Sequence, residues 1–137
     1  MKTINVVAAV IKFNNLFLCV QRGVGKHDYI SRKFEFPGGK VEPNESQEEA
    51  LVREIKEELN KDIVIVEKLL TVDHEYPDFR ILMHTFLCKA QNDKVQLTEH
   101  IDFKWLSVSE LRSLDWAAAD IPIVNSLIEL NASSKFS

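Results

Sequence analysis

Three glutamates stand close together in the segment Arg53-Glu54-Ile55-Lys56-Glu57-Glu58. In a helix, residues three and four positions apart share a face, which brings the carboxylates of Glu54, Glu57 and Glu58 within reach of one another. Unpaired like charges at this spacing destabilise a helix by roughly 0.2–0.5 kcal/mol per pair, whereas a bound divalent cation reverses the sign. Because carboxylate oxygens are hard ligands, the pattern indicates Mg²⁺ or Mn²⁺. A solvated acidic helix face is the more common origin of such a pattern, so the surrounding sequence must show whether this one binds a metal.

A strand and a tight turn precede this segment. The run Phe34-Glu35-Phe36 ends in Pro37-Gly38-Gly39, and an apolar run that stops at proline and two glycines predicts a strand leading into a turn. A carbonyl in such a turn is not shielded by side chains, and backbone oxygens commonly bind hard cations. The turn therefore offers a further oxygen ligand next to the glutamates.

The helix that carries the glutamates has both of its ends marked in the sequence. Ser46 and Glu49 form a capping box at its start, and Asn60 suits its end because asparagine tolerates the left-handed conformation of a C-terminal cap. An apolar stripe is expected to anchor this helix to the core, and it consists of Leu51, Val52, Ile55 and Leu59. The carboxylates then face away from the centre of the core.

The stretch from Gly39 to Lys61 resembles the Nudix box. The residues that match the family pattern are Gly39, Glu45, Arg53, Glu54, Ile55, Glu57 and Glu58. A match at so many chemically distinct positions with fixed spacing is a strong signal. Asn60 stands where the family usually has glycine, and Lys61 stands where it usually has an aliphatic residue. Neither position supplies a metal ligand, so we expect Asn60 to keep the cap geometry and Lys61 to affect only local packing.

Members of this family typically hydrolyse a nucleoside diphosphate linked to another moiety, and clustered carboxylates do so through bound Mg²⁺. The resemblance implies that the ligands of Mg²⁺, or of Mn²⁺ in its place, are the Gly39 carbonyl and the side chains of Glu54, Glu57 and Glu58. Arg53 is then an organiser that pairs with nearby carboxylates. We favour Glu54 as the general base and keep Glu99 as its competitor, since several family members supply an extra acidic ligand from the corresponding loop. An exposed loop glutamate explains Glu99 equally well.

The expected substrate contacts are spread along the chain. The arrangement is similar to the MutT-like branch of the family, where an arginine at the end of the second strand reaches the phosphates; Arg22 holds this position, with a solvated strand end as the alternative. Lys40 adjoins the turn and is equally well explained as a surface residue. The candidates for contact with the base are Glu35, Phe36, Tyr76, Arg80 and Asp120. Aromatic residues beside a sheet belong more often to the core than to a stacking platform.

The C-terminal part, with Trp105-Leu106-Ser107 and Ala118-Ala119-Asp120-Ile121-Pro122, is most similar to bacterial CTP pyrophosphohydrolases. A carboxylate only accepts hydrogen bonds, so Asp120 suits an exocyclic amino group such as N4 of cytosine, whereas an amide would suit an oxo-purine. Asp120 is also predicted to cap the last helix, and the two roles are compatible. Together these features predict hydrolysis of CTP, dCTP or a modified dCTP to the nucleoside monophosphate and pyrophosphate.

Three alternative functions stay open. Hydrolysis of 8-oxo-dGTP uses the same scaffold and differs at a few base contacts. Hydrolysis of ADP-ribose or of dinucleoside polyphosphates is also compatible, because the box reads only the diphosphate. The third alternative is a Nudix-like domain that binds a nucleotide without cleaving it, although the intact set of glutamates speaks against this.

The remaining sequence predicts an α/β/α sandwich around a mixed sheet. Strands are expected at 4–13, 16–20, 34–36, 64–66 with 69–72, 79–90 and 102–106, with a turn at Asn14-Asn15 and a polar loop at 23–33. A second capping box, Ser107 with Glu110, opens a short helix, and the last helix has an apolar stripe of Val124, Leu127 and Ile128 that can extend to Leu130. Helices on both faces of the sheet give the sandwich, which is also the Nudix fold.

Length and composition predict a single domain over residues 1–137, and the resemblance implies that it is a Nudix hydrolase domain. The chain has 45% hydrophobic residues, enough for one continuous core, and a net charge of −4, which argues against a nucleic-acid partner. An anionic nucleoside triphosphate then depends on the metal and on nearby arginine and lysine. Cys19 and Cys88 lie in apolar runs, which predicts two buried reduced thiols in a cytoplasmic protein. Neither a signal peptide nor a membrane span is expected, and the protein is predicted to be a monomer or a homodimer.

Overall fold

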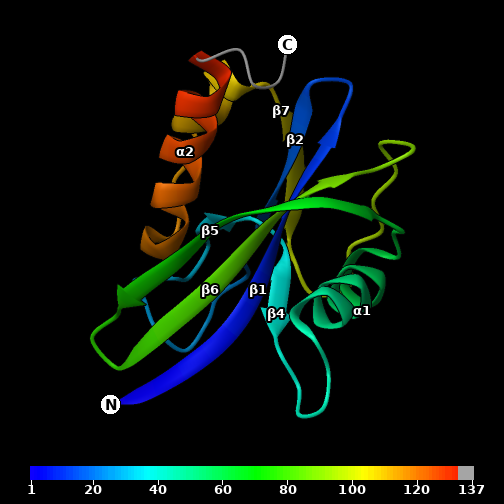
Figure 1. The fold of residues 1–137 in the computed structure, drawn as a ribbon. Coiled ribbons are helices and arrows are strands. Elements are labelled where there is room, and N and C mark those ends of the chain that lie inside the picture. Colours follow the sequence, from blue (N-terminus) through cyan, green and yellow to red (C-terminus); the bar gives the residue numbers. More distant parts are fainter. Residues whose placement is uncertain (133–137) are drawn as a thin grey trace.

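The computed structural model describes residues 1–132 and arranges them around a mixed sheet, with an α-helix on either side of its central strand (Figure 1). The strands are β1 (Lys2–Phe13), β2 (Leu16–Gln21), β3 (Phe34–Glu35), β4 (Gly38–Lys40), β5 (Val64–Glu75), β6 (Phe79–Lys89) and β7 (Asp102–Leu106). The helices are α1 (Gln47–Leu59), the 3-10 helices η1 (Val108–Ser113) and η2 (Ala118–Asp120), and α2 (Ile121–Ala132). The predicted α/β/α sandwich is confirmed.

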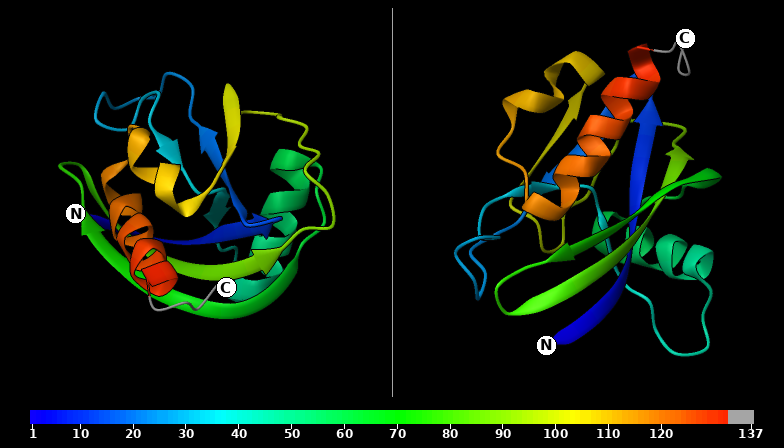
Figure 2. Two further views of the ribbon diagram at one scale, coloured as in Figure 1. Left: turned by 90° about the horizontal axis from the view of Figure 1, so that it is seen from above. Right: turned by 60° about the vertical axis from the view of Figure 1, so that its left-hand side comes forward.

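The sheet is mixed because β1 pairs with its neighbours in both senses. The strand order is β3-β2-β1-β6-β5, with β4 pairing with β1 and β7 with β2. Strand β1 runs antiparallel to β2 and β4 and parallel to β6. The two apolar pieces expected at 64–66 and 69–72 form the single strand β5, whose register with β6 shifts twice between them. Figure 2 shows β5 and β6 as a long curved hairpin.

The core lies in two layers, one on each face of β1. Side chains alternate along a strand, so Val7, Ala9 and Ile11 join the layer under α1, whereas Ala8 and Val10 join the layer under α2. This burial on both faces explains why the first apolar run is almost continuous.

The turn between β1 and β2 forms as predicted. Asn14 and Asn15 have φ angles of 49° and 62°, and Phe13 pairs with Leu16 across the turn. A two-residue turn with both φ angles positive matches the right-handed twist of the strands that it joins, and asparagine adopts this conformation more readily than most residues.

Helix α1 has the predicted caps and a slightly different buried face. The capping box of Ser46 and Glu49 is present, and Asn60 ends the helix in the left-handed conformation with φ of 50°. The buried residues are Ala50, Leu51, Ile55 and Leu59. The prediction for Val52 is wrong, because its side chain is 46% exposed. The four-residue spacing of 51, 55 and 59 sets the buried face, and position 52 is rotated away from it by about 100°.

The C-terminal segment corrects the prediction that Asp120 caps the last helix. The capping box of Ser107 and Glu110 opens η1, which is a 3-10 helix. Helix η2 continues directly into α2, so Asp120 lies inside a helical run. Its carboxylate Oδ1 instead accepts a hydrogen bond of 2.9 Å from the backbone N–H of Phe36. The buried stripe of α2 comprises Ile123, Val124 and Leu127, with Ile128 packed at its edge.

The two cysteines are buried and are not joined to each other, as predicted. Cys19 belongs to the core layer under α2 and Cys88 to the layer under α1. Burial raises the pKa of each thiol to about 12, so both thiols are protonated at neutral pH. No helix within residues 1–132 is long and apolar enough to cross a membrane.

Candidate active site

A cleft of about 470 Å³ runs from the glycine pair of β4 to Tyr76 and Phe79, at the turn between β5 and β6. We call one part of it the carboxylate side; it contains Gly39, Glu58 and Glu99. We call the other part the aromatic side; it contains Phe36, Tyr76, Phe79 and Asp120. Two further polar residues of the lining, Arg22 and Glu35, have side chains that touch each other.

Arg53 ties together three segments beside the carboxylate side. Its guanidinium donates to both oxygens of Glu45, from Nε at 3.0 Å and from Nη2 at 2.7 Å, and Nη2 also donates to the Lys40 carbonyl at 3.1 Å. Its Nη1 donates to Glu54 at 2.9 Å and to Glu57 at 3.3 Å. The hydrogen bonds to Glu45, and next those to Glu54, raise the pKa of Arg53 above its already high ordinary value, so the positive charge is permanent. One side chain thus links the loop before α1, strand β4 and the acidic face of α1.

Glu58 carries a partly buried carboxyl near the end of α1. Its Oε2 is buried and has no hydrogen-bond partner among the described residues. Burial raises the pKa of the Glu58 carboxyl to about 9, and the charge of Glu54, whose carboxylate is within hydrogen-bonding reach, is the next cause. Two carboxylates this close require either a shared proton or a cation. A cation at this point would therefore replace a proton.

The glycine pair is shaped by two close backbone approaches. A Cβ at Gly39 would lie 2.4 Å from the carboxyl carbon of Glu54, and a Cβ at Gly38 would lie 1.9 Å from the carbonyl oxygen of Val7. The second contact arises because the residues expected to form only a turn also form β4, which pairs with β1. Only glycine lets this backbone reach both the sheet and the carboxylate.

The donor set on the carboxylate side fits a hard divalent cation. It offers carboxylate oxygens, a buried oxygen without a partner on Glu58, and a backbone that approaches Glu54 without a side chain. Within residues 1–132, no three acidic, histidine or cysteine side chains already converge as a metal cage. Arg53 pairs with both Glu54 and Glu57. Glu57 is 61% exposed, so a cation that used it would compete with Arg53 for a solvent-accessible carboxylate.

The loop between β6 and β7 contributes Glu99 and His100 to the cleft. Glu99 lies near enough to Glu58 for its charge to help raise the pKa of that carboxyl. The His100 side chain is only 7% exposed, and its Nε2 lies 3.0 Å from Oε2 of Glu35. Its Nδ1 is buried without a partner among the described residues. Because Glu35 accepts hydrogen bonds, this contact favours the tautomer with a proton on Nε2.

Glu35 lies between the two sides of the cleft. Its Oε1 accepts from Arg22 Nη1 at 3.1 Å, while Oε2 faces His100. Its charge acts on both sides, because it helps to raise the pKa of Glu58 and that of Asp120. The pKa of Asp120 is raised mainly by burial, since the residue is only 4% exposed. A donor from a ligand would offset that cost of ionisation.

The two aromatic candidates line the cleft and also have ring partners of their own. Phe36 stacks on Trp116 with ring centroids 4.7 Å apart. Tyr76 stacks on Tyr29 at 5.3 Å, and its hydroxyl accepts a hydrogen bond of 2.9 Å from the backbone N–H of Ala119. Each ring is therefore fixed in orientation before any ligand arrives.

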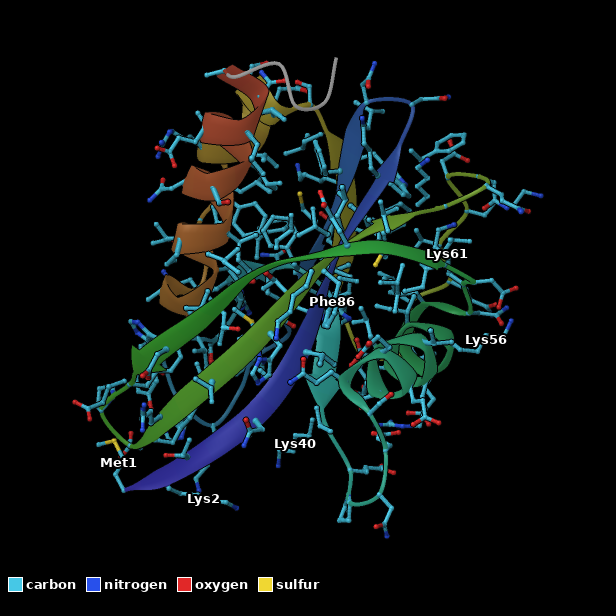
Figure 3. All side chains as sticks on the ribbon, in the orientation of Figure 1. Met1, Lys2, Lys40, Lys56, Lys61 and Phe86 are labelled. Atoms are coloured by element: carbon cyan, nitrogen blue, oxygen red, sulfur yellow. The ribbon has the colours of Figure 1, made fainter. Side chains whose placement is uncertain are left out.

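Arg80 is the base-side candidate that the structure does not bring into the cleft. Its guanidinium forms an ion pair with Asp73 across the β5–β6 hairpin, and it is absent from the cleft lining. Lys40, labelled in Figure 3, is exposed at the rim of the cleft. Glu54, Glu57 and Arg53 do not line the cleft, although the Glu54 carboxylate lies against Gly39, which does.

Comparison with known proteins shows which family this chain is similar to. Residues 1–127 match the family described as NUDIX domain. The CTP pyrophosphohydrolase of Escherichia coli K12 is 36% identical over 132 residues, which cover 96% of both chains. The 8-oxo-dGTP diphosphatase of Proteus vulgaris is 42% identical over 100 residues, covering 72% of this chain and 85% of that protein. The solution structure of the E. coli ORF135 protein has a TM-score of 0.82 at 34% identity and covers 100% of this chain and 96% of its own.

The chain belongs to the Nudix family. It is a Nudix hydrolase that acts on nucleotide anhydrides, and the Nudix fold predicted from the sequence is confirmed. Nudix hydrolases generally use divalent metal ions, which agrees with the oxygen donors around Glu58 and Gly39.

The Nudix box of this chain departs from the family pattern at two positions, and the structure accounts for both. Asn60 adopts the left-handed conformation in which glycine is usual, and its N–H donates to the Lys56 carbonyl at 3.0 Å. Lys61 is only 5% exposed. The expectation that Lys61 affects only local packing is too narrow, because its ammonium group binds the loop between β6 and β7.

His100 is the residue of this Nudix cleft that sequence reasoning missed. A lone histidine in a loop carries no spacing signal, and only its position next to Glu99 pointed to the site. Its partner Glu35 lies 65 residues away in the sequence, and pairing between strands brings the two together.

Proposed function

We propose that this Nudix hydrolase is a Mg²⁺-dependent nucleoside triphosphate pyrophosphohydrolase that converts CTP, dCTP or a modified dCTP, with water, to the monophosphate and pyrophosphate. The observation that carries the choice of cytosine is Asp120, a carboxyl that lines the aromatic side of the cleft, is only 4% exposed and accepts a hydrogen bond from the Phe36 N–H through Oδ1. The likeness to the E. coli CTP pyrophosphohydrolase over 96% of both chains supports the same choice.

The metal would lie at the carboxylate side, held by Glu58 and the Gly39 carbonyl of the cleft lining together with Glu54 and Glu57 next to it. Bound there, Mg²⁺ neutralises charge on phosphate oxygens and lowers the pKa of a water molecule. Arg53 keeps Glu54 oriented towards Gly39 through its 2.9 Å contact. Glu54 and Glu99 both stand close enough to Glu58 to influence its pKa, and either can take a proton from water at this point.

The phosphates need positive charge beyond the metal, because most charged residues of the cleft lining are acidic. Arg22 is the strongest candidate, since its side chain is 42% exposed and reaches the cleft beside Glu35. A triphosphate would compete with Glu35 for the Arg22 guanidinium, which matches phosphate geometry.

The base would lie on the aromatic side. Phe36 and Tyr76 are held by their ring partners and present fixed apolar surface. The amino group at C4 of cytosine would give Asp120 a second donor besides the Phe36 N–H, and accepting that hydrogen bond would lower the cost of ionising this buried carboxyl. Uracil has an oxygen at the same position and offers no such donor.

Hydrolysis of 8-oxo-dGTP is the second candidate. It is favoured by the likeness to the 8-oxo-dGTP diphosphatase of Proteus vulgaris. This protein is 42% identical to the chain over 100 residues, whereas the CTP pyrophosphohydrolase is 36% identical over 132 residues. The two functions would share the carboxylate side and differ on the aromatic side.

The test is a panel of substrates compared by kcat/KM with Mg²⁺ and with EDTA. CTP and UTP form the matched pair, because they differ in the hydrogen-bonding groups at positions 3 and 4 of the ring; dCTP, dGTP and 8-oxo-dGTP complete the panel. We expect CTP and dCTP to be preferred over UTP by about tenfold or more, the value of one good base contact, and EDTA to abolish turnover. A strong preference for 8-oxo-dGTP would overturn the choice of cytosine. Absence of pyrophosphate release from every substrate would favour a binding module.

A further inference from the structure

Lys61 is a buried lysine whose three ammonium protons are all matched by oxygen acceptors. Its Nζ lies 3.0 Å from the Asn92 carbonyl, 3.0 Å from Asn92 Oδ1 and 2.7 Å from the Lys94 carbonyl. The indole ring of Trp105 stands beside it, with its centroid 5.9 Å away. A buried ammonium group is costly unless it is fully hydrogen-bonded, so this lysine and the 91–95 segment stabilise each other.

The same loop also closes the C-terminal end of α1. The last carbonyls of a helix have no partner within the helix. Here the backbone N–H of Gln96 donates to the Leu59 carbonyl at 3.1 Å, and that of Thr98 donates to the Glu58 carbonyl at 3.2 Å. Asn60 adds a hydrogen bond of 2.9 Å from its Nδ2 to Gln96 Oε1. The two positions where this chain departs from the Nudix box, 60 and 61, therefore both bind this loop.

The anchoring reaches the candidate active site within a few residues. Thr98 also donates from its hydroxyl to the Glu58 carbonyl at 3.1 Å, and Glu99 follows it directly in the cleft lining. Glu58 is thus bound to the loop through its backbone carbonyl, and both Glu58 and Glu99 line the cleft. A shift of the loop would move Glu99 relative to the acidic face of α1.

We propose that Lys61 is a positioning residue, which together with Asn60 holds the 91–98 segment against the end of α1 so that Glu99 faces Glu58. This inference rests on the proposed function, because it gives Glu99 a part in the reaction. An aliphatic residue at position 61 would leave the carbonyls of Asn92 and Lys94 without this donor. The loop would then detach more often, and the effect would fall on turnover more than on nucleotide binding.

The test is Lys61→Met, which keeps an unbranched side chain and removes the ammonium group. We expect hydrogen exchange at the Gln96 and Thr98 amides to accelerate by at least tenfold, and kcat to fall by about ten- to a hundredfold, as for a misplaced catalytic group. KM for the nucleotide should change little. The matched control is Lys56→Met, which removes the same charge from the same end of α1; Lys56 pairs with Asp62 at 3.3 Å and is labelled with Lys61 in Figure 3. This control should leave both readouts at wild-type values.

A second comparison asks whether Lys61 acts through Glu99. In a Glu99→Gln background, Lys61→Met should cause no further loss of kcat. If the losses of the two substitutions multiply, the proposal is overturned. It is also overturned if amide hydrogen exchange is unchanged in the Lys61→Met single variant. Wild-type activity in Glu99→Gln would remove the coupling to catalysis while leaving the hydrolase assignment in place. A wild-type protein that hydrolyses no nucleotide would instead overturn the proposed function, and amide exchange would still decide whether Lys61 holds the loop.

Asn60→Gly is a second variant that tests the same proposal if the Lys61→Met protein does not fold. Glycine keeps the left-handed cap and removes only the side-chain hydrogen bond to Gln96. The same two readouts should move in the same direction by a smaller factor. Exchange and kcat that both stay at wild-type values in this variant would contradict the proposal.

Discussion

The carboxylate side of the cleft comes mainly from one short stretch of chain, whereas the aromatic side is assembled from distant elements. Arg53 and its partner Glu45 are separated by only 8 residues. Phe36 and Asp120, joined by a hydrogen bond on the aromatic side, are separated by 84. The geometry of the first depends on one capped helix and one glycine pair, while the geometry of the second depends on the whole sheet. The two sides should therefore respond differently to substitution.

Glu54→Gln and Glu58→Gln should have the largest effect, because they remove the charge that would hold the metal. We expect each to lower kcat by at least about a hundredfold while the protein remains folded, since the metal supplies several kcal/mol of transition-state stabilisation. The measurement is steady-state pyrophosphate release with Mg²⁺. Glu48→Gln, an exposed glutamate in the first turn of the same helix, is the control and should retain activity. Near-normal turnover in both variants would contradict the assignment of the carboxylate side.

The same substitution at two adjacent glycines should separate chemistry from folding. Alanine at Gly39 meets the movable end of the Glu54 side chain, so activity should fall while the fold survives. Alanine at Gly38 meets the backbone of Val7 in the sheet, so it should destabilise the protein by about 1–3 kcal/mol or more. Thermal unfolding and kcat, measured on both variants, check this. Equal effects of the two substitutions on both quantities would break the distinction.

Asp120→Asn should change the choice of base more than the rate. Asparagine has the same shape and can still accept the hydrogen bond from the Phe36 N–H. It also carries an amide donor, so we expect the ratio of kcat/KM for CTP to that for 8-oxo-dGTP to fall by about tenfold. Equal losses on all substrates would instead assign Asp120 a packing role and remove the contrast between the two sides.

The smallest expected effect is on stability, and it concerns Glu58 in protein freed of metal by EDTA. Its carboxyl has a pKa of about 9 when folded, against an ordinary value of 4.5, so the folded state holds the proton more tightly. The stability that this proton provides is complete below pH 4.5 and is lost as the pH rises towards 9. Glu58→Gln cannot lose a proton, so its unfolding temperature should decline less between these pH values than that of the wild type. If the unfolding temperatures of the wild type and of Glu58→Gln decline equally with pH, Glu58 is not held protonated in the folded state.

Helical periodicity and caps made the carboxylate side predictable from the sequence. Ser46, Glu49 and Asn60 fix where α1 begins and ends, and the three- and four-residue spacing fixes its acidic face. The prediction failed for Val52, which lies at the margin of the apolar stripe where periodicity alone does not separate buried from exposed. The pairing of Gly38 with β1 was also outside local reasoning, since it depends on a distant strand.

The aromatic side was less predictable because its contacts are long-range. Asp120 lines the cleft, but its hydrogen bond goes to Phe36 and not to the start of α2. Arg80 lies on a strand that reaches the cleft, yet Asp73 on the neighbouring strand holds its guanidinium away from it. His100 became visible only when strand pairing brought it to Glu35. Pattern and spacing do not contain such pairings.

The central claim is that the acidic face of α1, with bound Mg²⁺, hydrolyses a nucleoside triphosphate to the monophosphate and pyrophosphate. Product analysis by ³¹P NMR, with CTP as substrate and with either Mg²⁺ or EDTA present, tests it most directly. The account predicts CMP and pyrophosphate in equal amounts, only with Mg²⁺, and no products from the Glu58→Gln variant on the same timescale. Formation of CDP and phosphate, or equal turnover in EDTA, would contradict it.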